Sequence, residues 1–109
     1  MIDQKELDKK THYTVLFSYY QSLLTEKQKD FFISYYDEDY SLSEIAVANS
    51  ISKNAVWDAL KKVTSQLDEY EKKLRLYQKD QFINEKLNKL KNHVDEIGLE
   101  IINQLEERE

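Results

Sequence analysis

The sequence predicts an all-α protein, and three observations support this fold class. The 109 residues include no proline and a single glycine, so the turn residues that a β-rich fold requires are missing. Apolar side chains recur every three or four residues along most of the chain, which is the spacing of one helix face. Hydrophobic residues make up 40% of the composition, enough for a packed core in one domain.

The first two helices are predicted to carry aromatic faces. The first runs from about Lys5 to Leu24, and its apolar face consists of Tyr13, Leu16, Phe17, Tyr20 and Leu23 or Leu24. Thr25 and Gln28 have the spacing of a capping box, which predicts the start of a second helix. This helix carries Phe31, Phe32, Tyr35 and Tyr36 and is expected to end in the acidic stretch "DEDY", residues 37–40.

Residues 41–62, "SLSEIAVANSISKNAVWDALKK", have the pattern of a helix-turn-helix. Ser41 and Glu44 form a second potential capping box at the start of a short third helix, which is expected to end near Asn49. Ser52 is expected to cap the fourth helix, which would begin at Lys53. We expect the two helices to be held together by four apolar side chains, those of Ile45, Ile51, Val56 and Leu60.

The outward side of the fourth helix is the candidate nucleic-acid-binding surface. Its residues are Lys53, Asn54, Trp57, Lys61 and Lys62. Asparagine can pair with adenine through two hydrogen bonds, and lysine can contact guanine or phosphate. The alternative is a solvated first turn with Trp57 packed into a groove between helices, which we favour for the tryptophan because a lone tryptophan at a helix edge usually fills a groove.

Charge limits how strongly this surface could attract DNA. The chain has 21 acidic against 16 basic residues, a formal net charge of −5. Residues 53–62 carry a local charge of +2, whereas residues 25–40 and 82–109 carry −3 each. Affinity for DNA grows with the number of phosphates that are neutralised. We therefore expect a single chain to bind weakly, and a dimer that presents two such helices to bind better.

The C-terminal half shows two heptad stripes. The first extends the fourth helix through Leu60, Val63, Leu67, Tyr70, Leu74 and Tyr77. After the polar stretch "QKDQ", residues 78–81, the second stripe begins at Ile83 and continues to Leu105. The pattern predicts two long amphipathic helices, which either fold together as a hairpin or face a second chain.

We expect the second stripe to mediate oligomerisation, giving a homodimer. Its candidate residues are Leu87, Leu90, Val94, Ile97 and Ile101. The chain would then be a single domain, 1–109, with a helix-turn-helix bundle in residues 1–64 and the long helical extension or hairpin in residues 65–109. Gly98 lies beside the stripe and either permits close approach of another helix or is a tolerated weak position.

Several classes of function are disfavoured. The chain has no cysteine, no glycine-rich phosphate loop and no nucleophile motif, so we expect a protein that is not an enzyme and has no cofactor. His93 and Glu96 could share a metal, but without a second ligand motif we expect a solvated pair. The longest aliphatic run, Ile45–Ala48, is far too short to span a membrane, so a cytoplasmic protein without membrane insertion is expected.

Three segments together resemble the YlxM family of bacterial proteins. They are "FSYYQSLLTEKQKDFF", "YSLSEIAVANSISKNAVWDALKK" and "LDEYEKKLRLYQK", and the likeness covers roughly residues 10–80. The family's helix-turn-helix is similar to region 4 of sigma factors, so the resemblance implies a DNA-binding regulator. Its genes commonly neighbour that of the signal recognition particle GTPase, which implies this GTPase or its RNA as a partner.

The chain departs from the family pattern at three places. Members tend to have Arg-Gln where this chain has Lys53-Asn54, a bulky apolar residue at the position of Asn49, and a tyrosine at that of Trp57. A lysine is a point charge and cannot replace the bidentate recognition of an arginine. Two functions stay open: a helix-turn-helix regulator that binds duplex DNA or structured RNA, and a protein-interaction module that modulates the signal recognition particle machinery. The lysines of residues 53–62 favour the first, and the net charge and apolar stripes favour the second.

Overall fold

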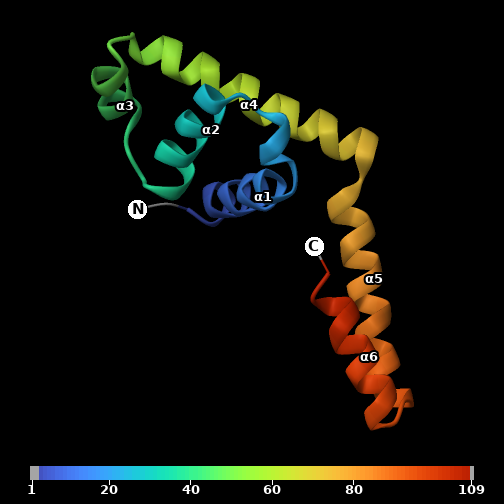
Figure 1. Ribbon diagram of the computed structural model, residues 1–109. Helices are drawn as coiled ribbons and strands as arrows, with labels where there is room; N and C mark the ends of the chain where they lie inside the picture. The colour runs from blue at the N-terminus through green and yellow to red at the C-terminus, as the bar shows by residue number, and fades with distance from the viewer. Residues whose placement is uncertain (1–2, 109) are drawn as a thin grey trace. The chain divides into compact units, whose positions relative to one another are not determined.

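The structure is a computed structural model that describes residues 3–108 (Figure 1). This range contains six α-helices and no strand: α1 (Gln4–Tyr20), α2 (Glu26–Phe32), α3 (Leu42–Asn49), α4 (Lys53–Leu74), α5 (Leu76–Leu90) and α6 (Glu96–Glu106). Three short helical segments connect them: η1 (Gln21–Leu23), η2 (Ile33–Asp37) and η3 (Lys91–His93). The predicted all-α fold class is confirmed. The chain divides between Leu74 and Arg75 into two compact units.

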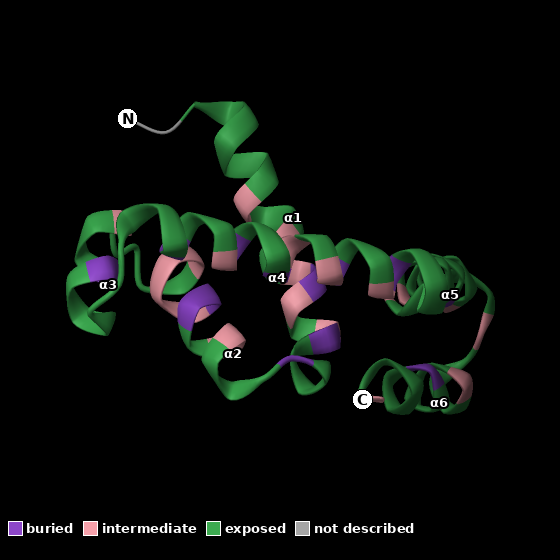
Figure 2. Ribbon diagram, turned by 90° about the horizontal axis from the view of Figure 1, so that it is seen from above, coloured by how far each residue is buried: buried purple, intermediate pink, exposed green. Residues whose placement is uncertain are grey.

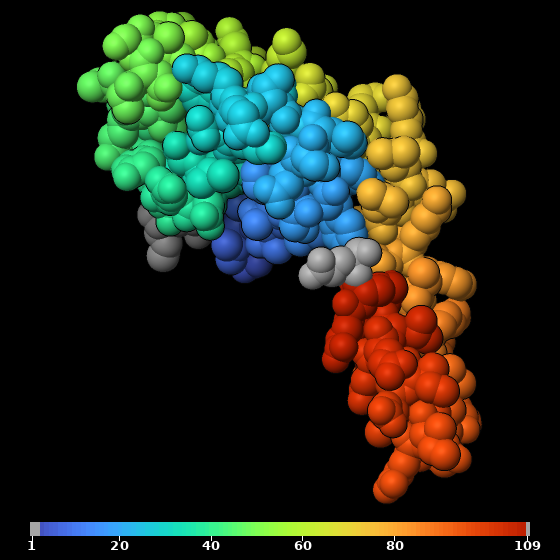
Figure 3. All heavy atoms as spheres, in the orientation of Figure 1, coloured from blue at the N-terminus to red at the C-terminus, as the bar shows by residue number. Residues whose placement is uncertain are grey.

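Helix α4 is the centre of the first unit, because α1, α2 and α3 all pack against it. Its buried stripe consists of Val56, Leu60, Val63 and Leu67, each at most 2% exposed. Figure 2 shows buried and exposed positions alternating along this helix. In the space-filling view, residues of α1, α2 and α3 form a continuous packed body (Figure 3). One face of α4 therefore supplies the core, and the other face stays in solvent.

Polar contacts also tie α1 to α4. The Tyr20 hydroxyl donates a hydrogen bond of 2.5 Å to Glu71 Oε1, and both side chains are buried. The Tyr13 hydroxyl donates to Asp68 Oδ2 at 2.9 Å. Burial, followed by this hydrogen bond and the charge of Asp68, raises the pKa of Tyr13 above its usual value. A buried carboxylate is costly unless hydrogen-bonded, so the Tyr20–Glu71 contact fixes the register of α1 on α4.

Both predicted capping boxes are present. Thr25 Oγ1 accepts from the Gln28 N–H while the Gln28 side chain accepts from the Thr25 N–H, and Ser41 and Glu44 make the same reciprocal pair. The backbone and side-chain hydrogen bonds from Ser41 hold the pKa of Glu44 below its usual value. These caps fix where α2 and α3 begin.

Helix α2 is shorter than predicted. The α-helical hydrogen bonding ends at Phe32 and continues as the wider π-type turn η2, after which Asp39 adopts a left-handed conformation with φ of 58°. Tyr35 and Tyr36 lie in this turn and are half-buried. The turn brings both rings beside α1, where Tyr36 packs edge-on to Tyr13.

The predicted continuation of the fourth helix through Tyr77 is wrong. Helix α4 ends at Leu74, because Arg75 adopts a left-handed conformation with φ of 57°, and α5 begins at Leu76. The "QKDQ" stretch, which was expected to separate the two stripes, lies inside α5. A heptad stripe cannot report such a break, since the apolar spacing continues across it.

The second unit is an antiparallel hairpin of α5 and α6. Arg108, just after α6, forms a 2.9 Å ion pair with Asp80 near the start of α5, and Lys91 and Glu106 pair at 2.7 Å. The chain turns between Leu90 and Glu96, where Asp95 caps α6 by accepting from the Gly98 N–H. The long second helix predicted to run from Ile83 to Leu105 is therefore interrupted.

The turn changes which residues are buried in α6. Ile102 is 2% exposed, whereas Ile101 of the predicted stripe is 53% exposed. The close approach at Gly98 is made by the adjoining turn and not by another helix, since a Cβ added there would lie 2.7 Å from the Val94 Cβ. Glycine is needed at this position because Val94 occupies the space of a side chain.

We predict that Tyr20→Phe destabilises the protein by about 1–3 kcal/mol, because a buried hydrogen bond to a carboxylate would be lost. Chemical denaturation followed by circular dichroism measures the change. Tyr40→Phe is the matched control, since Tyr40 is 46% exposed. Equal stability of the two variants would show that the buried hydrogen bond does not stabilise the fold.

Candidate nucleic-acid interface

The helix-turn-helix consists of α3, a three-residue turn and the start of α4. Ser50 ends α3 in a left-handed conformation with φ of 55° and ψ of 41°. Ser52 Oγ accepts from the Ala55 N–H at 3.0 Å and caps α4 as predicted. The two helices are joined by a cluster of buried residues: Phe31, Ile45, Ala46, Val56 and Leu60.

Ile51 does not join this cluster, and its predicted role in holding the two helices together is wrong. Its side chain is 39% exposed, while its backbone N–H donates to the Ala46 carbonyl at 3.1 Å. The residue closes the turn with its backbone, and Phe31 of α2 fills the core position instead.

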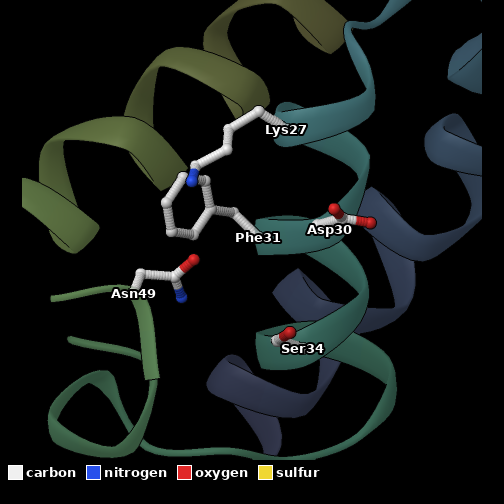
Figure 4. A pocket seen from close by; sticks show the side chains of 5 residues that line it. All are labelled: Lys27, Asp30, Phe31, Ser34 and Asn49. Carbon is white, nitrogen blue, oxygen red and sulfur yellow. The ribbon is translucent and has the colours of Figure 1, made fainter. Parts of the chain in front are cut away.

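The end of α3 is anchored beside Phe31 (Figure 4). Lys27 and Asn49 flank the Phe31 ring, with Lys27 Nζ 5.4 Å from the ring centroid. The Asn49 amide nitrogen donates to the Ile45 carbonyl at 2.8 Å. These residues, with Asp30 and Ser34, line a small polar pocket of about 80 Å³. Asn49 thus adds a side-chain hydrogen bond within the last turn of α3, and the buried Ile45 and Ala46 supply the apolar anchoring.

All five residues predicted to bind nucleic acid are exposed on α4: Lys53, Asn54, Trp57, Lys61 and Lys62. Within residues 3–108, Lys53, Asn54 and Lys62 make no side-chain hydrogen bond or ion pair. Lys61 lies 3.6 Å from Asp58 and 5.8 Å from the centroid of the Trp57 ring. Helix α4 therefore offers three exposed side chains without partners in the described residues, and one lysine held over an aromatic ring.

Trp57 is 42% exposed and borders a groove between α1, η2 and α4. The groove has a part of about 330 Å³ and a smaller part of about 130 Å³. Both parts are lined by Lys9, Tyr36 and Trp57; the larger adds Glu6, Lys10 and Tyr35, and the smaller adds Tyr13, Leu60, Lys61 and Thr64. We call this the aromatic–lysine groove. Trp57 is thus neither packed into a core nor fully free, and it joins the groove to the exposed face of α4.

Sequence reasoning missed the contribution of α1 to this surface. The sequence pattern assigns no role to Lys9 or Lys10, and it places Tyr35 and Tyr36 on the aromatic face of the second helix. In the structure Lys10 Nζ lies 5.0 Å from the Tyr35 ring centroid and 3.5 Å from Asp39. No local pattern reports this arrangement, because it depends on where α1 crosses α4.

The surroundings of the groove shift the pKa of one of its residues, Tyr36. Burial, followed by the charges of Tyr35 and Tyr13, raises the pKa of Tyr36 to about 12. The neutral phenol is therefore favoured in the folded chain, and the ring of Tyr36 stacks on Phe32 at 4.4 Å between centroids.

In the described part of the chain, no group of three or more His, Cys, Asp or Glu side chains could hold a metal ion. His93 lies in the exposed segment η3, and Glu96 begins α6. None of the helices within residues 3–108 has the length and apolar character that crossing a membrane requires.

We predict that stability falls as pH rises from about 10, the ordinary pKa of tyrosine, to the folded-state value of about 12 for Tyr36. In this window the unfolded chain loses a proton that the folded chain keeps, so the free energy of unfolding decreases. Urea denaturation at several alkaline pH values measures the slope. Tyr36→Phe should flatten it, and an unchanged slope in this variant would contradict the assignment to Tyr36.

Comparison with known proteins assigns the chain to a family. The family model UPF0122, described as "Putative helix-turn-helix protein, YlxM / p13 like", matches residues 7–108. The UPF0122 protein YlxM of Bacillus subtilis (strain 168) is 47% identical over 85 residues, covering 78% of this chain and 77% of the relative. A UPF0122 protein of Geobacillus sp. (strain WCH70) is 41% identical over 109 residues, covering 94% and 99%.

A third relative, the UPF0122 protein of Anoxybacillus flavithermus, is 44% identical over 90 residues and covers 83% of this chain and 82% of its own. The matched residues include both helices of the helix-turn-helix and most of the second unit. The chain belongs to the UPF0122 family of YlxM/p13-like helix-turn-helix proteins.

Proposed function

We propose that this protein is a regulator that binds duplex DNA through the exposed face of the first turns of α4, and that it acts by binding and not by catalysis. One observation supports the proposal above all. The α3–turn–α4 packing leaves Lys53 and Asn54 exposed in the first turn of α4 and Lys62 exposed further along the helix, all three without side-chain partners in residues 3–108. An unpaired basic face on the second helix of a helix-turn-helix is the surface that enters the major groove in such proteins.

The chemistry of this face favours phosphate contacts over base reading. Lys53, Lys61 and Lys62 are point charges that can approach phosphates from several directions. Asn54 is the side chain of this face that can pair with a base, adenine, through two hydrogen bonds. The proposed complex therefore depends strongly on salt and discriminates little between sequences.

The aromatic–lysine groove extends this surface onto α1. Lys9 lines both parts of the groove together with Trp57, so the groove brings a basic residue of α1 next to α4. In a helix-turn-helix complex, elements beside the recognition helix contact the DNA backbone. We assign Lys9 this role, which adds one phosphate contact to those of α4.

A second candidate function is a protein-interaction module, and the second unit favours it. The apolar side chains of α5 and α6 are largely exposed, and residues 82–109 carry a charge of −3, which disfavours contact with nucleic acid. The resemblance to the YlxM family suggests the signal recognition particle GTPase, or its RNA, as the partner in this case.

The DNA proposal is tested by fluorescence anisotropy with a random duplex at several salt concentrations. The three lysines of α4 and Lys9 make four contacts per chain, which predicts a slope of log affinity against log salt of about −4, or about −7 if two chains bind together. Lys53→Glu with Lys61→Glu should weaken binding roughly tenfold or more and make the slope shallower by about two per chain. Lys9→Glu should reduce the slope by about one.

Lys72→Glu with Lys73→Glu is the matched control, because it makes the same change of charge on the same helix about 16 Å from Lys61 (eleven residues at 1.5 Å each). This control should bind nearly as well as the parent chain. Absence of duplex binding at low salt, together with retention of the signal recognition particle components in a pull-down, would reject the DNA proposal in favour of the second candidate.

A further inference from the structure

The second unit leaves much of its apolar surface uncovered. It spans residues 75–109, and in its described residues only Leu87 and Ile102 are buried apolar side chains. Most of α5 and α6 is exposed (Figure 2). Folded units below about 40 residues usually require disulfides, metals or oligomerisation, and this chain has no cysteine. Further burial of apolar surface would therefore stabilise the hairpin substantially.

Five of the exposed apolar residues form one face of the hairpin, whereas Phe82, Ile97 and Leu99 lie outside it. Leu90 and Leu105 each follow, by three residues, the side chain that is buried between the helices, Leu87 in α5 and Ile102 in α6. Three residues correspond to about 300°, so both side chains are rotated from the buried position by about 60° in the same sense. Because α5 and α6 run antiparallel, the same rotation brings both to the same side of the hairpin.

Further residues extend this hairpin face along each helix. On α5, Leu76 and Ile83 precede Leu90 at intervals of seven residues, and on α6, Ile101 lies one turn before Leu105. All five are between 42% and 53% exposed. Two parallel apolar rows on adjacent helices are the arrangement found inside four-helix bundles, where a second pair of helices covers them.

Charge indicates which helices could cover this face. Helix α5 carries three lysines against two acidic residues, a formal charge of +1, whereas α6 carries three glutamates and no basic residue, a charge of −3. A second copy related by a twofold axis parallel to the helices would place its α6 against α5 and its α5 against α6. This arrangement makes all neighbouring helices antiparallel and sets unlike charges against each other twice.

We propose that the hairpin face binds the same face of a second copy, giving a homodimer that is held together by an antiparallel four-helix bundle. The residues that make the contact are Leu76, Ile83, Leu90, Ile101 and Leu105. Leu87 belongs to the interior of each hairpin and not to the interface between copies. The dimer carries two copies of α4, but its formation does not depend on DNA binding.

Sedimentation equilibrium of the full chain tests the proposal. At about 50 μM the parent protein should have twice its chain mass of 13.1 kDa. Ile83→Asp and Leu105→Asp should each raise the dissociation constant roughly a hundredfold, since a carboxylate would be buried unpaired in both copies. A parent chain that is monomeric at this concentration would overturn the proposal.

Two further variants separate loss of the interface from loss of folding. Ile83→Ala removes apolar surface while alanine favours the helix, so the helical circular dichroism signal should persist while association weakens by roughly tenfold. Asn88→Asp adds the same charge as Ile83→Asp on an exposed position away from the hairpin face, and it should remain a dimer. Equal dissociation of Asn88→Asp and Ile83→Asp would refute the assignment of the interface to this face.

Discussion

The buried stripe of α4 is the constraint on which the first unit depends. Val56 and Leu60 hold α3 and α2, and Val63 and Leu67 continue the same stripe along the part of α4 that α1 and α2 cover. A helix of 22 residues with one face fixed in this way has no freedom to rotate. The direction in which Lys53, Asn54 and Lys62 point is therefore decided by apolar packing and not by the polar residues themselves.

This arrangement explains how an acidic protein can present a basic surface. The net charge of −5 is distributed over other parts of the chain, including the acidic turn after η2 and helix α6. Lys61 is held over Trp57, and Lys9 of α1 lines the same groove as this tryptophan. The Tyr20–Glu71 hydrogen bond fixes the crossing of α1 and α4, so a buried polar contact far along α4 supports the position of Lys9.

Local signals in the sequence predicted the starts of α2, α3 and α4 correctly, but not those of α5 and α6. The Thr25–Gln28 and Ser41–Glu44 pairs and the cap at Ser52 depend only on neighbouring residues, and each was placed correctly. The break at Arg75 could not be predicted. No glycine, proline or asparagine marks the position where Arg75 turns left-handed, and the apolar stripe continues past it. Asp95 is a common N-cap residue and could have indicated the start of α6. Without this start, the heptad stripe assigned the apolar face to Ile101, whereas Ile102 is the buried residue.

The candidate site likewise contains residues that local patterns predict and residues that only tertiary packing brings together. The exposed residues of α4 follow from helical periodicity once the cap at Ser52 is known. Lys9, Lys10, Tyr35 and Tyr36 border the site through tertiary packing, and the π-type turn that places the two tyrosines leaves no pattern in the sequence. Periodicity can therefore define a face of one helix, but it cannot identify the neighbouring helix that completes a surface.

The most direct test is to map the backbone amide resonances of the isotopically labelled protein during titration with a random duplex at low salt. We predict the largest shift changes in residues 53–62, a second group at Lys9 and Lys10, and small changes in residues 75–108. Shift changes confined to residues 75–108, or absent from the first turns of α4, would contradict DNA binding by α4.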